Sequence, residues 1–178
     1  MKDEAWLRAE TPATPRASII QRPLVAAKLL RRAKSPVIVV GHEAAEGEGS
    51  PALGPVVRIA RAIGAPVIAT GGVSQELGRR GLPAAIAMSA MEAGDRLLDP
   101  AWRPAPGRNP PDYAFLLGIP FPISSVIEAG LASFARGHLK VISLDRLYHP
   151  HCSLSFPNQS REVWGRNLEA IAGEVEKG

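Results

Sequence analysis

Short apolar runs, rich in β-branched residues and bounded by proline and glycine, recur along this chain and constrain its fold more than any other feature. Residues 36–41 (PVIVVG) form the first run, and similar runs follow at residues 66–71, 84–88, 113–118 and 140–145. Such continuous runs are typical of strands buried on both faces of a parallel sheet. Segments with helical spacing separate most of them, at residues 23–34, 55–63, 123–135 and 161–175. This alternation predicts an α/β protein with a parallel sheet.

The predicted architecture is a single Rossmann-like α/β domain over residues 23–178, with about six parallel strands flanked by helices. The length of 178 residues suits one domain. Residues 152–156 (CSLSF) alternate weakly and add a candidate edge strand. Residues 99–111 contain five prolines, so we expect an irregular connection between the two halves of the sheet. Residues 1–22 begin without apolar periodicity and are predicted to form an extended N-terminal arm.

The positive charge is unevenly distributed. Residues 1–35 hold eight Lys and Arg against three acidic residues, whereas residues 36–178 hold 13 basic and 14 acidic residues. Proteins that bind nucleic acid usually carry a basic stripe on the folded body, with aromatic side chains where they bind single strands. Only 5% of residues are aromatic here. The sequence therefore argues against a nucleic-acid partner and leaves either a solvated basic helix face or a patch that meets an acidic partner.

Composition excludes several other classes. No apolar run reaches the roughly 18 residues that a membrane-spanning helix needs, so we expect no membrane partner. The first residues (MKDEAWLRAETP) lack the apolar core of a signal peptide, which favours a cytoplasmic protein. The single cysteine forms no internal disulfide and cannot by itself hold an iron–sulfur cluster, so no metal site is predicted.

Glycines at the ends of predicted strands suggest a ligand site. In open parallel sheets, ligands bind outside the carboxyl ends of the strands, where glycine lets the backbone approach them. Asp145 ends the fifth strand, where a carboxylate can accept hydrogen bonds from a ribose or adenine. We therefore predict a nucleotide-binding crevice with the candidate residues Gly41, His42, Thr70, Gly71, Gly72, Gly118 and Asp145. Ordinary turn roles explain the same residues, and neither a G-x-G-x-x-G fingerprint nor a P-loop is present.

The remaining polar motifs indicate no catalytic centre. His149-Pro150-His151 is expected to be a turn with surface imidazoles, because a structural zinc site usually needs four ligands. Cys152 lacks a paired base, since a neighbouring residue in a strand points the opposite way. Residues 41–51 carry three carboxylates without the spacing of a calcium loop, and are expected to be a flexible acidic loop.

Several longer stretches carry a family resemblance. They are RAKSPVIVVG at 32–41, APVIATG at 65–71, LDPAW at 98–102, PDYAFLLG at 111–118, ISLDRLYHP at 142–150 and LSFPNQS at 154–160. With these stretches in order over about residues 25–175, the chain resembles the epsilon subunit of the archaeal acetyl-CoA decarbonylase/synthase complex. The resemblance implies a Rossmann-type, DHS-like NAD/FAD-binding domain, related to the middle domain of thiamine-diphosphate enzymes. It places Gly41, Gly71, Gly118 and Asp145 at the corresponding strand ends.

The resemblance also implies a function. The expected role is a non-catalytic accessory subunit that docks on the nickel–iron carbon monoxide dehydrogenase (alpha) subunit in an α₂ε₂ assembly. FAD is a candidate cofactor, and assistance of electron transfer to a flavin a candidate role, on fold grounds alone. Residues 42–54 and 103–111 depart from the family pattern. We expect the proline-rich loop, the basic arm and an exposed Trp102 to contribute to docking. The alternatives are a free-standing nucleotide- or FAD-binding protein and a small hydrolase or transferase, which would need a nucleophile–base pair.

Overall fold

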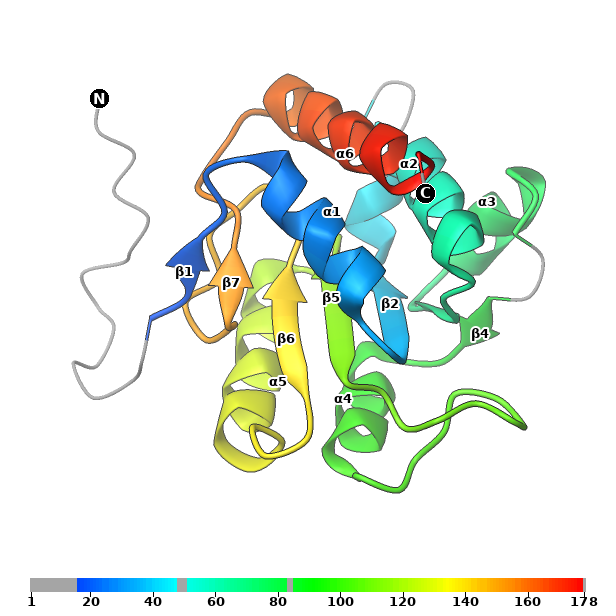
Figure 1. Cartoon of the computed structure of the whole chain (residues 1–178), viewed down its shortest axis with the longest axis vertical. Helices are drawn as coiled ribbons and strands as arrows, with labels where there is room; N and C mark the ends of the chain where they lie inside the picture. Colours follow the sequence, from blue (N-terminus) through cyan, green and yellow to red (C-terminus); the bar gives the residue numbers. More distant parts are fainter. Residues whose placement is uncertain (1–15, 48–50, 83–84, 178) are drawn as a thin grey trace.

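The computed structural model describes residues 16–47, 51–82 and 85–177. Within these residues the chain forms one sheet of seven parallel strands, ordered β1-β7-β6-β5-β2-β3-β4 (Figure 1). The strands are β1 (Ser18–Ile19), β2 (Pro36–Val40), β3 (Val67–Ala69), β4 (Ile86–Ala87), β5 (Tyr113–Leu117), β6 (Lys140–Ser143) and β7 (Leu154–Ser155). The helices are α1 (Pro23–Arg32), α2 (Leu53–Ile63), α3 (Val73–Arg79), α4 (Ala90–Leu98), α5 (Phe121–Phe134) and α6 (Arg161–Val175), with a short 3₁₀ helix η1 (His42–Ala45). The predicted parallel α/β fold is confirmed.

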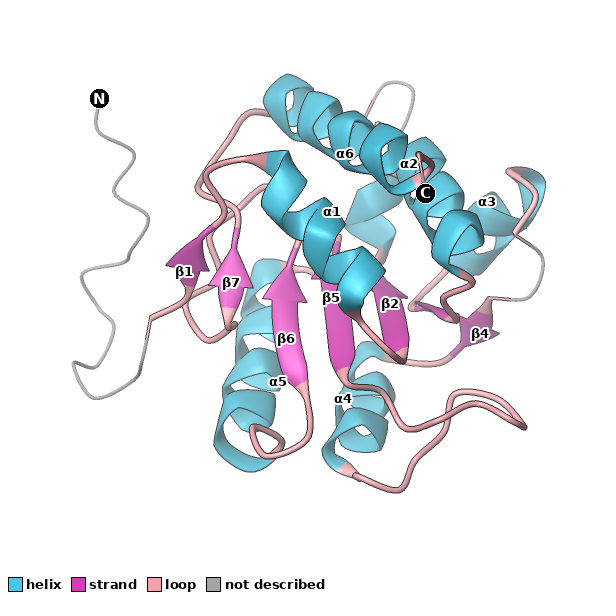
Figure 2. Ribbon diagram, in the orientation of Figure 1, coloured by secondary structure: helices cyan, strands magenta, loops and turns pink. Residues whose placement is uncertain are grey.

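Helices cover both faces of the sheet (Figure 2). Along β2, Ile38 and Val40 belong to a first core formed with α1, α2 and α6, whereas Val37 and Val39 belong to a second core formed with α4 and α5. Because side chains alternate across a strand, a continuous apolar run supplies both cores at once. Each fully buried Val or Leu contributes roughly 1.5–3 kcal/mol relative to exposure.

The sheet contains one strand more than expected. Residues 1–15 of the predicted arm lie outside the described residues, but Ser18 and Ile19 pair in parallel with Leu154 and Ser155. The short strand β1 therefore forms the edge of the sheet, and β7, the predicted edge strand, lies inside it. The hydroxyl of Tyr148 donates a 2.9 Å hydrogen bond to the Ala17 carbonyl and holds the chain at this edge.

Two helices were not anticipated from the apolar pattern, namely α3 and α4. The nine residues of α4 do carry a start signal: the Ser89 hydroxyl accepts a 3.0 Å hydrogen bond from the Glu92 N–H, as in a capping box. The seven residues of α3 are too few to show periodicity. In contrast, α6 spans the residues that the sequence predicts.

Successive strands are added to the sheet on one side of β2 and then, from β5 on, on the other side. Strands β3 and β4 extend the sheet on one side of β2, and the irregular residues 99–112 then bring the chain back to β5. Strands β2 and β5 lie side by side, with Val40 opposite Leu117. This is the switch point of the sheet, where open parallel sheets bind ligands at the carboxyl edge.

Candidate functional site

The predicted glycines Gly41 and Gly118 meet at the switch point, where β2 and β5 end. A Cβ atom added to Gly41 would lie 2.0 Å from the Gly118 carbonyl oxygen, and one added to Gly118 would lie 2.4 Å from the Ala44 nitrogen. The Gly41 N–H donates to the Leu117 carbonyl, and the Glu43 N–H donates to the Gly118 carbonyl, both at 2.9 Å. The two strand ends and η1 therefore close against one another through their backbones.

Asp145 holds this closed arrangement in place. Its carboxylate accepts hydrogen bonds from the Gly118 N–H at 2.7 Å and from the Arg146 N–H at 2.6 Å. Burial raises the pKa of Asp145 above its ordinary value, against the opposing effects of His149 and of the Gly118 and Arg146 donors. Because Gly118 has φ of +69°, the bond from Asp145 fixes a turn that only glycine adopts readily.

The other predicted site residues lie along the same edge, over the end of β3. The Thr70 N–H donates to the Val40 carbonyl at 2.8 Å, and a Cβ atom on Gly71 would lie 3.8 Å from the Cβ of His42. Gly72 precedes the first residue of α3. The His42 imidazole is about half exposed, and its Nε2 lies 3.8 Å from Glu46 Oε1. The structure thus brings all seven candidates to one edge.

A dinucleotide at this edge would need free backbone donors beside glycines with open space. The N–H groups of Gly41, Glu43 and Gly118 are all engaged by protein acceptors, and the space beside both glycines is filled by backbone. The switch point itself therefore does not fit a pyrophosphate group. Ligand binding by His42 and residues 70–72 stays a prediction.

A buried polar network that the sequence analysis missed links α5 to the segment between β6 and β7. His149 Nδ1 lies 2.9 Å from Glu128 Oε2, and the Ser124 hydroxyl donates to Glu128 Oε1 at 2.8 Å. The His149 N–H donates to the Ser155 hydroxyl at 2.9 Å. His149 is 1% exposed, so the expectation that it is a surface imidazole is wrong. The sequence did contain a signal for this buried network, because Glu128 is the one charged residue within α5.

The network has a structural cause. Residues 144–153, which we call the crossover segment, return from the end of β6 to the start of parallel β7 without a helix. Parallel strands are usually joined by a dozen or more residues that include a helix, whose backbone satisfies itself. The crossover segment lacks those internal bonds, so its buried polar groups depend on side chains from elsewhere. Glu128 supplies one of these partners.

The titratable groups of this network do not form a nucleophilic centre. Burial by itself lowers the pKa of His149, but the hydrogen bond and charge of Glu128, with smaller contributions from Asp145 and Glu43, outweigh it and raise the pKa. Burial and the nearby Glu128 raise the pKa of the Cys152 thiol well above its ordinary value. A neutral buried thiol is a poor nucleophile. The Glu128–His149 pair therefore holds the fold together and does not activate the Cys152 thiol.

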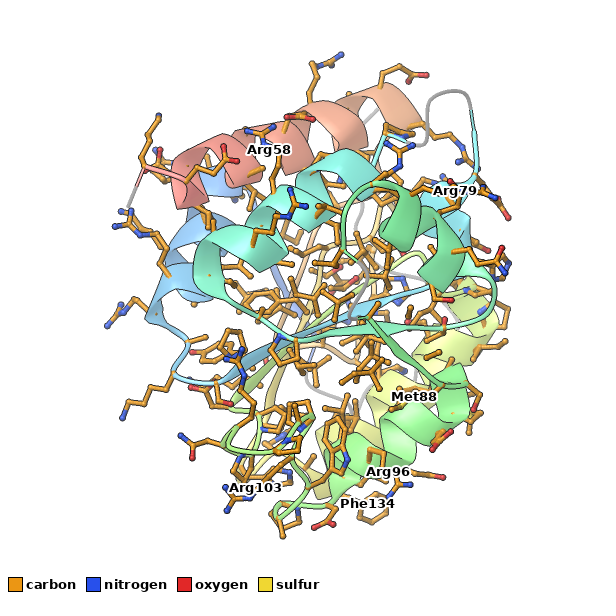
Figure 3. All side chains as sticks on the ribbon, turned by 90° about the vertical axis from the view of Figure 1, so that its right-hand side faces the viewer. Arg58, Arg79, Met88, Arg96, Arg103 and Phe134 are labelled. Atoms are coloured by element: carbon orange, nitrogen blue, oxygen red, sulfur yellow. The ribbon has the colours of Figure 1, made fainter. Side chains whose placement is uncertain are left out.

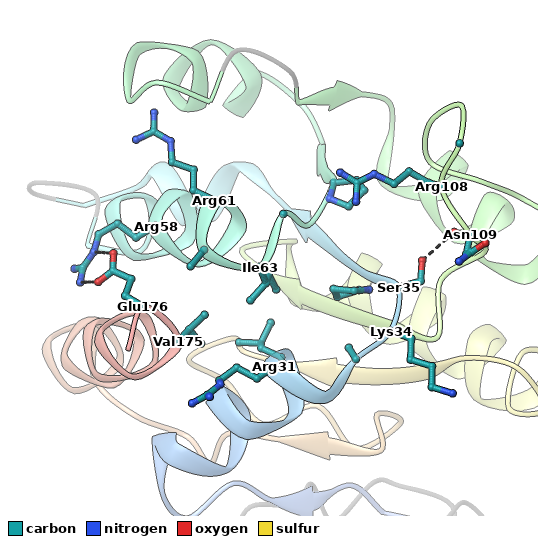
Figure 4. A pocket seen from close by; sticks show the side chains of 17 residues that line it. Arg31, Lys34, Ser35, Arg58, Arg61, Ile63, Arg108, Asn109, Val175 and Glu176 are labelled. Carbon is teal, nitrogen blue, oxygen red and sulfur yellow. Dashed lines mark hydrogen bonds and ion pairs between the residues drawn. The ribbon is translucent and has the colours of Figure 1, made fainter. Parts of the chain in front are cut away.

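A second unanticipated feature lies at the opposite, amino edge of the sheet. A cavity of about 850 Å³ opens there between the last residues of α1, α2 and α6 and residues 107–109 (Figure 4). Its charged lining residues are Arg31, Lys34, Arg58, Arg61, Arg108 and Glu176. These residues come from four parts of the chain, so only the folded structure brings them together.

Two loop predictions need correction. Trp102 is half-buried and packs against the second core, so the expectation that it is exposed is wrong. Residues 41–51 were expected to be a flexible acidic loop, but residues 42–45 of this stretch form the 3₁₀ helix η1. Its Ala44 is fully buried beside Gly118. Residues 48–50 of that loop lie outside the described residues.

In residues 16–47, 51–82 and 85–177, no group of three or more His, Cys, Asp or Glu side chains is placed to hold a metal ion. None of the helices in those ranges is both long and apolar enough to cross a membrane.

The fold and its switch point define a Rossmann-like α/β protein whose central crevice is closed by its own backbone. Over residues 6–172 the chain matches the family described as CO dehydrogenase beta subunit/acetyl-CoA synthase epsilon subunit, and it belongs to that family. This confirms the resemblance found in the sequence.

Relatives in methanogens and other archaea match over most of their length. The chain is 28% identical over 162 residues to the acetyl-CoA decarbonylase/synthase complex subunit epsilon of Methanothermobacter thermautotrophicus, covering 91% of each chain. It is 32% identical over 150 residues to subunit epsilon 1 of that complex from Methanosarcina barkeri, covering 84% of each. A third relative, subunit epsilon 1 from Archaeoglobus fulgidus, is 28% identical over 154 residues, covering 84% of this chain and 80% of the relative.

Proposed function

We propose that this chain is the epsilon subunit of an acetyl-CoA decarbonylase/synthase complex in the cytoplasm. Its role is non-catalytic: it docks on the nickel–iron carbon monoxide dehydrogenase (alpha) subunit and stabilises it, in an α₂ε₂ assembly. The observation that carries the proposal is the family match over residues 6–172, together with relatives named as epsilon subunits that align over most of both chains.

The chemistry of the chain supports an accessory role. Iron–sulfur clusters are held by several cysteine thiolates, and this sequence contains one cysteine. That cysteine, Cys152, is buried and its pKa is raised by burial. Electron-transfer chemistry in the assembly would therefore come from the partner's clusters or from a bound cofactor, and this chain would contribute surface and stability.

Co-purification tests the proposal. A tagged copy of this chain is expressed with the dehydrogenase subunit of the same organism, and the eluate is analysed by light scattering. We expect a complex with equal numbers of both chains, and a dehydrogenase subunit that unfolds at a higher temperature than alone, because binding to the native state stabilises it. A chain that elutes alone and leaves the dehydrogenase unchanged would contradict the proposal.

The alternative, a free-standing nucleotide- or FAD-binding protein, depends on His42 and residues 70–72, the candidates whose backbone surroundings are more open. Its test is the visible absorbance of the purified chain. Flavin bound to the isolated chain supports the alternative. Flavin that appears only in the purified complex would instead indicate a site that needs the partner.

A further inference from the structure

The amino-edge cavity carries a surplus of positive charge. We call it the basic groove and define it by Arg31, Lys34, Arg58, Arg61 and Arg108. Among the described residues, Glu176 is the one acidic residue in its lining. Arg58 already uses that carboxylate at 2.6 Å and also pairs with Glu169 at 2.5 Å. The groove therefore has five cationic side chains and one lining carboxylate among the described residues, and that carboxylate already pairs with Arg58.

Within the described ranges, four of the five cations have no carboxylate partner. Arg61 donates to the Gly81 carbonyl, which leaves Arg31, Lys34 and Arg108. These three residues are exposed, and among the described residues none of their side chains forms an ion pair. Figure 4 shows Arg31 and Lys34 along one side of the cavity and Arg108 along the other. An occupant of the groove would meet cationic side chains from both sides.

Helix ends account for only part of this charge. Helices α1, α2 and α6 all finish at this edge, and cations near helix C-termini are stabilised by the helix dipole. Arg31 and Arg61 lie in last turns and fit that explanation. Lys34 and Arg108 lie outside helices. The surplus of positive charge in the groove therefore points to an anionic group from outside the chain.

The exposed surface of α1, whose Leu30 and Arg31 line the groove, mixes basic and apolar side chains. No Asp or Glu occurs between Glu10 and Glu43. The exposed positions of α1 include Lys28 and Arg32 together with Leu24 and Val25, each of the latter pair 40% exposed. A mixture of arginine and apolar side chains is typical of protein–protein contacts.

The lining also distinguishes a protein partner from a nucleic acid. Proteins that hold single-stranded nucleic acid stack its bases on aromatic side chains. Within the part of the chain that the structure describes, no aromatic residue lines the basic groove, and its apolar lining comes from residues such as Leu30, Ile63 and Val175. Aliphatic side chains between cations suit a peptide with acidic side chains better than stacked bases.

We infer that the basic groove docks an acidic segment of the partner subunit, a stretch rich in Asp and Glu. The inference rests on the proposed function, because it assigns the surface through which this chain joins its complex. Charge complementarity of this kind mainly sets the association rate and the specificity, and it weakens as salt rises.

The test compares two charge-reversal variants with equal net charge. The groove variant carries Arg31→Glu, Lys34→Glu and Arg108→Glu. The control variant carries Arg80→Glu, Arg96→Glu and Arg136→Glu, three positions that are not lining residues of the groove; Figure 3 shows Arg96 on the opposite side of the sheet from Arg58. Each variant lowers the formal net charge of +4 by six. All six positions are exposed, so circular dichroism is expected to show both variants folded.

Binding to the dehydrogenase subunit and to a deca-glutamate peptide is measured for each protein at low and high salt. We expect the groove variant to bind both about tenfold or more weakly than the control variant at low salt, with the difference shrinking at about 1 M NaCl. If the wild-type chain binds the dehydrogenase but the groove and control variants bind equally, the inference fails and the proposed function stands.

If the wild-type chain does not bind the dehydrogenase at all, the proposed function fails, and the peptide titration alone then decides the inference. Peptide binding that is lost in the groove variant and kept in the control supports an acidic-segment site. Absence of peptide binding overturns it. Tighter binding of a single-stranded oligothymidylate than of the peptide also overturns it, in favour of nucleic acid.

Discussion

At the scale of single residues, the buried Glu128–His149 pair carries a large energetic consequence. Both side chains are almost completely buried, and His149 Nδ1 lies 2.9 Å from Glu128 Oε2. Removing one partner of such a pair leaves a buried polar group without compensation, at a cost of about 3–5 kcal/mol. The pair joins α5 to the crossover segment, so its loss would loosen the connection between β6 and β7.

The pair predicts a pH dependence of stability. The pKa of His149 is raised in the folded protein, so its contribution is complete below the unfolded value of 6.5 and is lost as the pH rises through the folded pKa. We expect the free energy of unfolding, measured with urea between about pH 6 and pH 8, to fall with rising pH. In Glu128→Gln we expect a loss of about 3 kcal/mol at pH 6 and a weaker slope, because burial alone lowers the pKa of His149.

His138→Gln serves as the control and is expected to keep the wild-type slope. His138 Nε2 lies 3.2 Å from the Leu97 carbonyl oxygen, in a partly buried position. Asp145 and Cys152, whose pKa values are raised by burial, are present in all three proteins. A Glu128→Gln protein with an unchanged slope would show that the pair does not carry the titration.

At the scale of elements, the ends of β2 and β5 determine what the switch point can do. The backbone of Gly41 contacts that of Gly118, η1 fits beneath Gly118, and Asp145 bonds to the turn from the end of β6. Four segments thus share one closely packed point. Glycine at both strand ends is required by the approach of backbone to backbone within the protein, where a nucleotide-binding sheet would use it to approach a ligand.

Alanine substitution tests this role. We expect Gly118→Ala to destabilise the protein by about 3 kcal/mol in urea unfolding, because it combines strain at φ of +69° with a Cβ atom 2.4 Å from the Ala44 nitrogen. The control is Gly130→Ala within α5, where an added Cβ meets nothing within 4 Å. It is expected to stabilise the protein by about 0.5–1 kcal/mol through helix propensity. Equal stability of the two variants would contradict the closed switch point.

At the scale of the whole molecule, one sheet separates two cores that share its strands. Trp164 is fully buried in the first core and donates a 2.7 Å hydrogen bond from Nε1 to the Leu144 carbonyl. Trp102 packs against the second core. Because β2 and β5 place alternate side chains in each core, neither core can open without exposing strands that belong to the other.

Two tryptophan variants test this cooperativity. Trp6→Phe/Trp164→Phe keeps Trp102 as a probe of the second core, and Trp6→Phe/Trp102→Phe keeps Trp164 as a probe of the first. In each variant we expect the fluorescence midpoint in urea to coincide with the midpoint from far-ultraviolet circular dichroism, as two-state unfolding requires. Fluorescence of the Trp102 probe that changes at a lower urea concentration would instead show that the second core opens independently.

The sequence predicted the elements that are defined locally and missed those defined by distant partners. The runs at β2, β5 and β6 are recognisable because burial on both faces makes them continuously apolar, and α6 because fifteen residues show a clear period. Strand β1 has two residues and exists only because β7 lies beside it. His149 looked like a surface imidazole because its partner Glu128 is 21 residues away.

For the candidate site, too, the sequence predicted the local features and the fold decided the rest. Sequence patterns placed seven residues at the carboxyl edge, and the structure brings them to that edge. Whether a glycine there faces a ligand or another strand depends on the distance between two backbones, which no local pattern encodes. The surplus of positive charge near the N-terminus was visible in the sequence, but Arg108 joins it only through the fold.

By itself, the sequence therefore determined the fold class, the family and the location of the net positive charge in the first 35 residues, since each follows from composition and local order along the chain. Only the tertiary structure decided that the switch point is closed, that Glu128 and His149 form a buried pair, and that five cations border one groove. The physical reason is that each of these features is a contact between residues far apart in sequence, formed when two faces of one sheet are covered by helices.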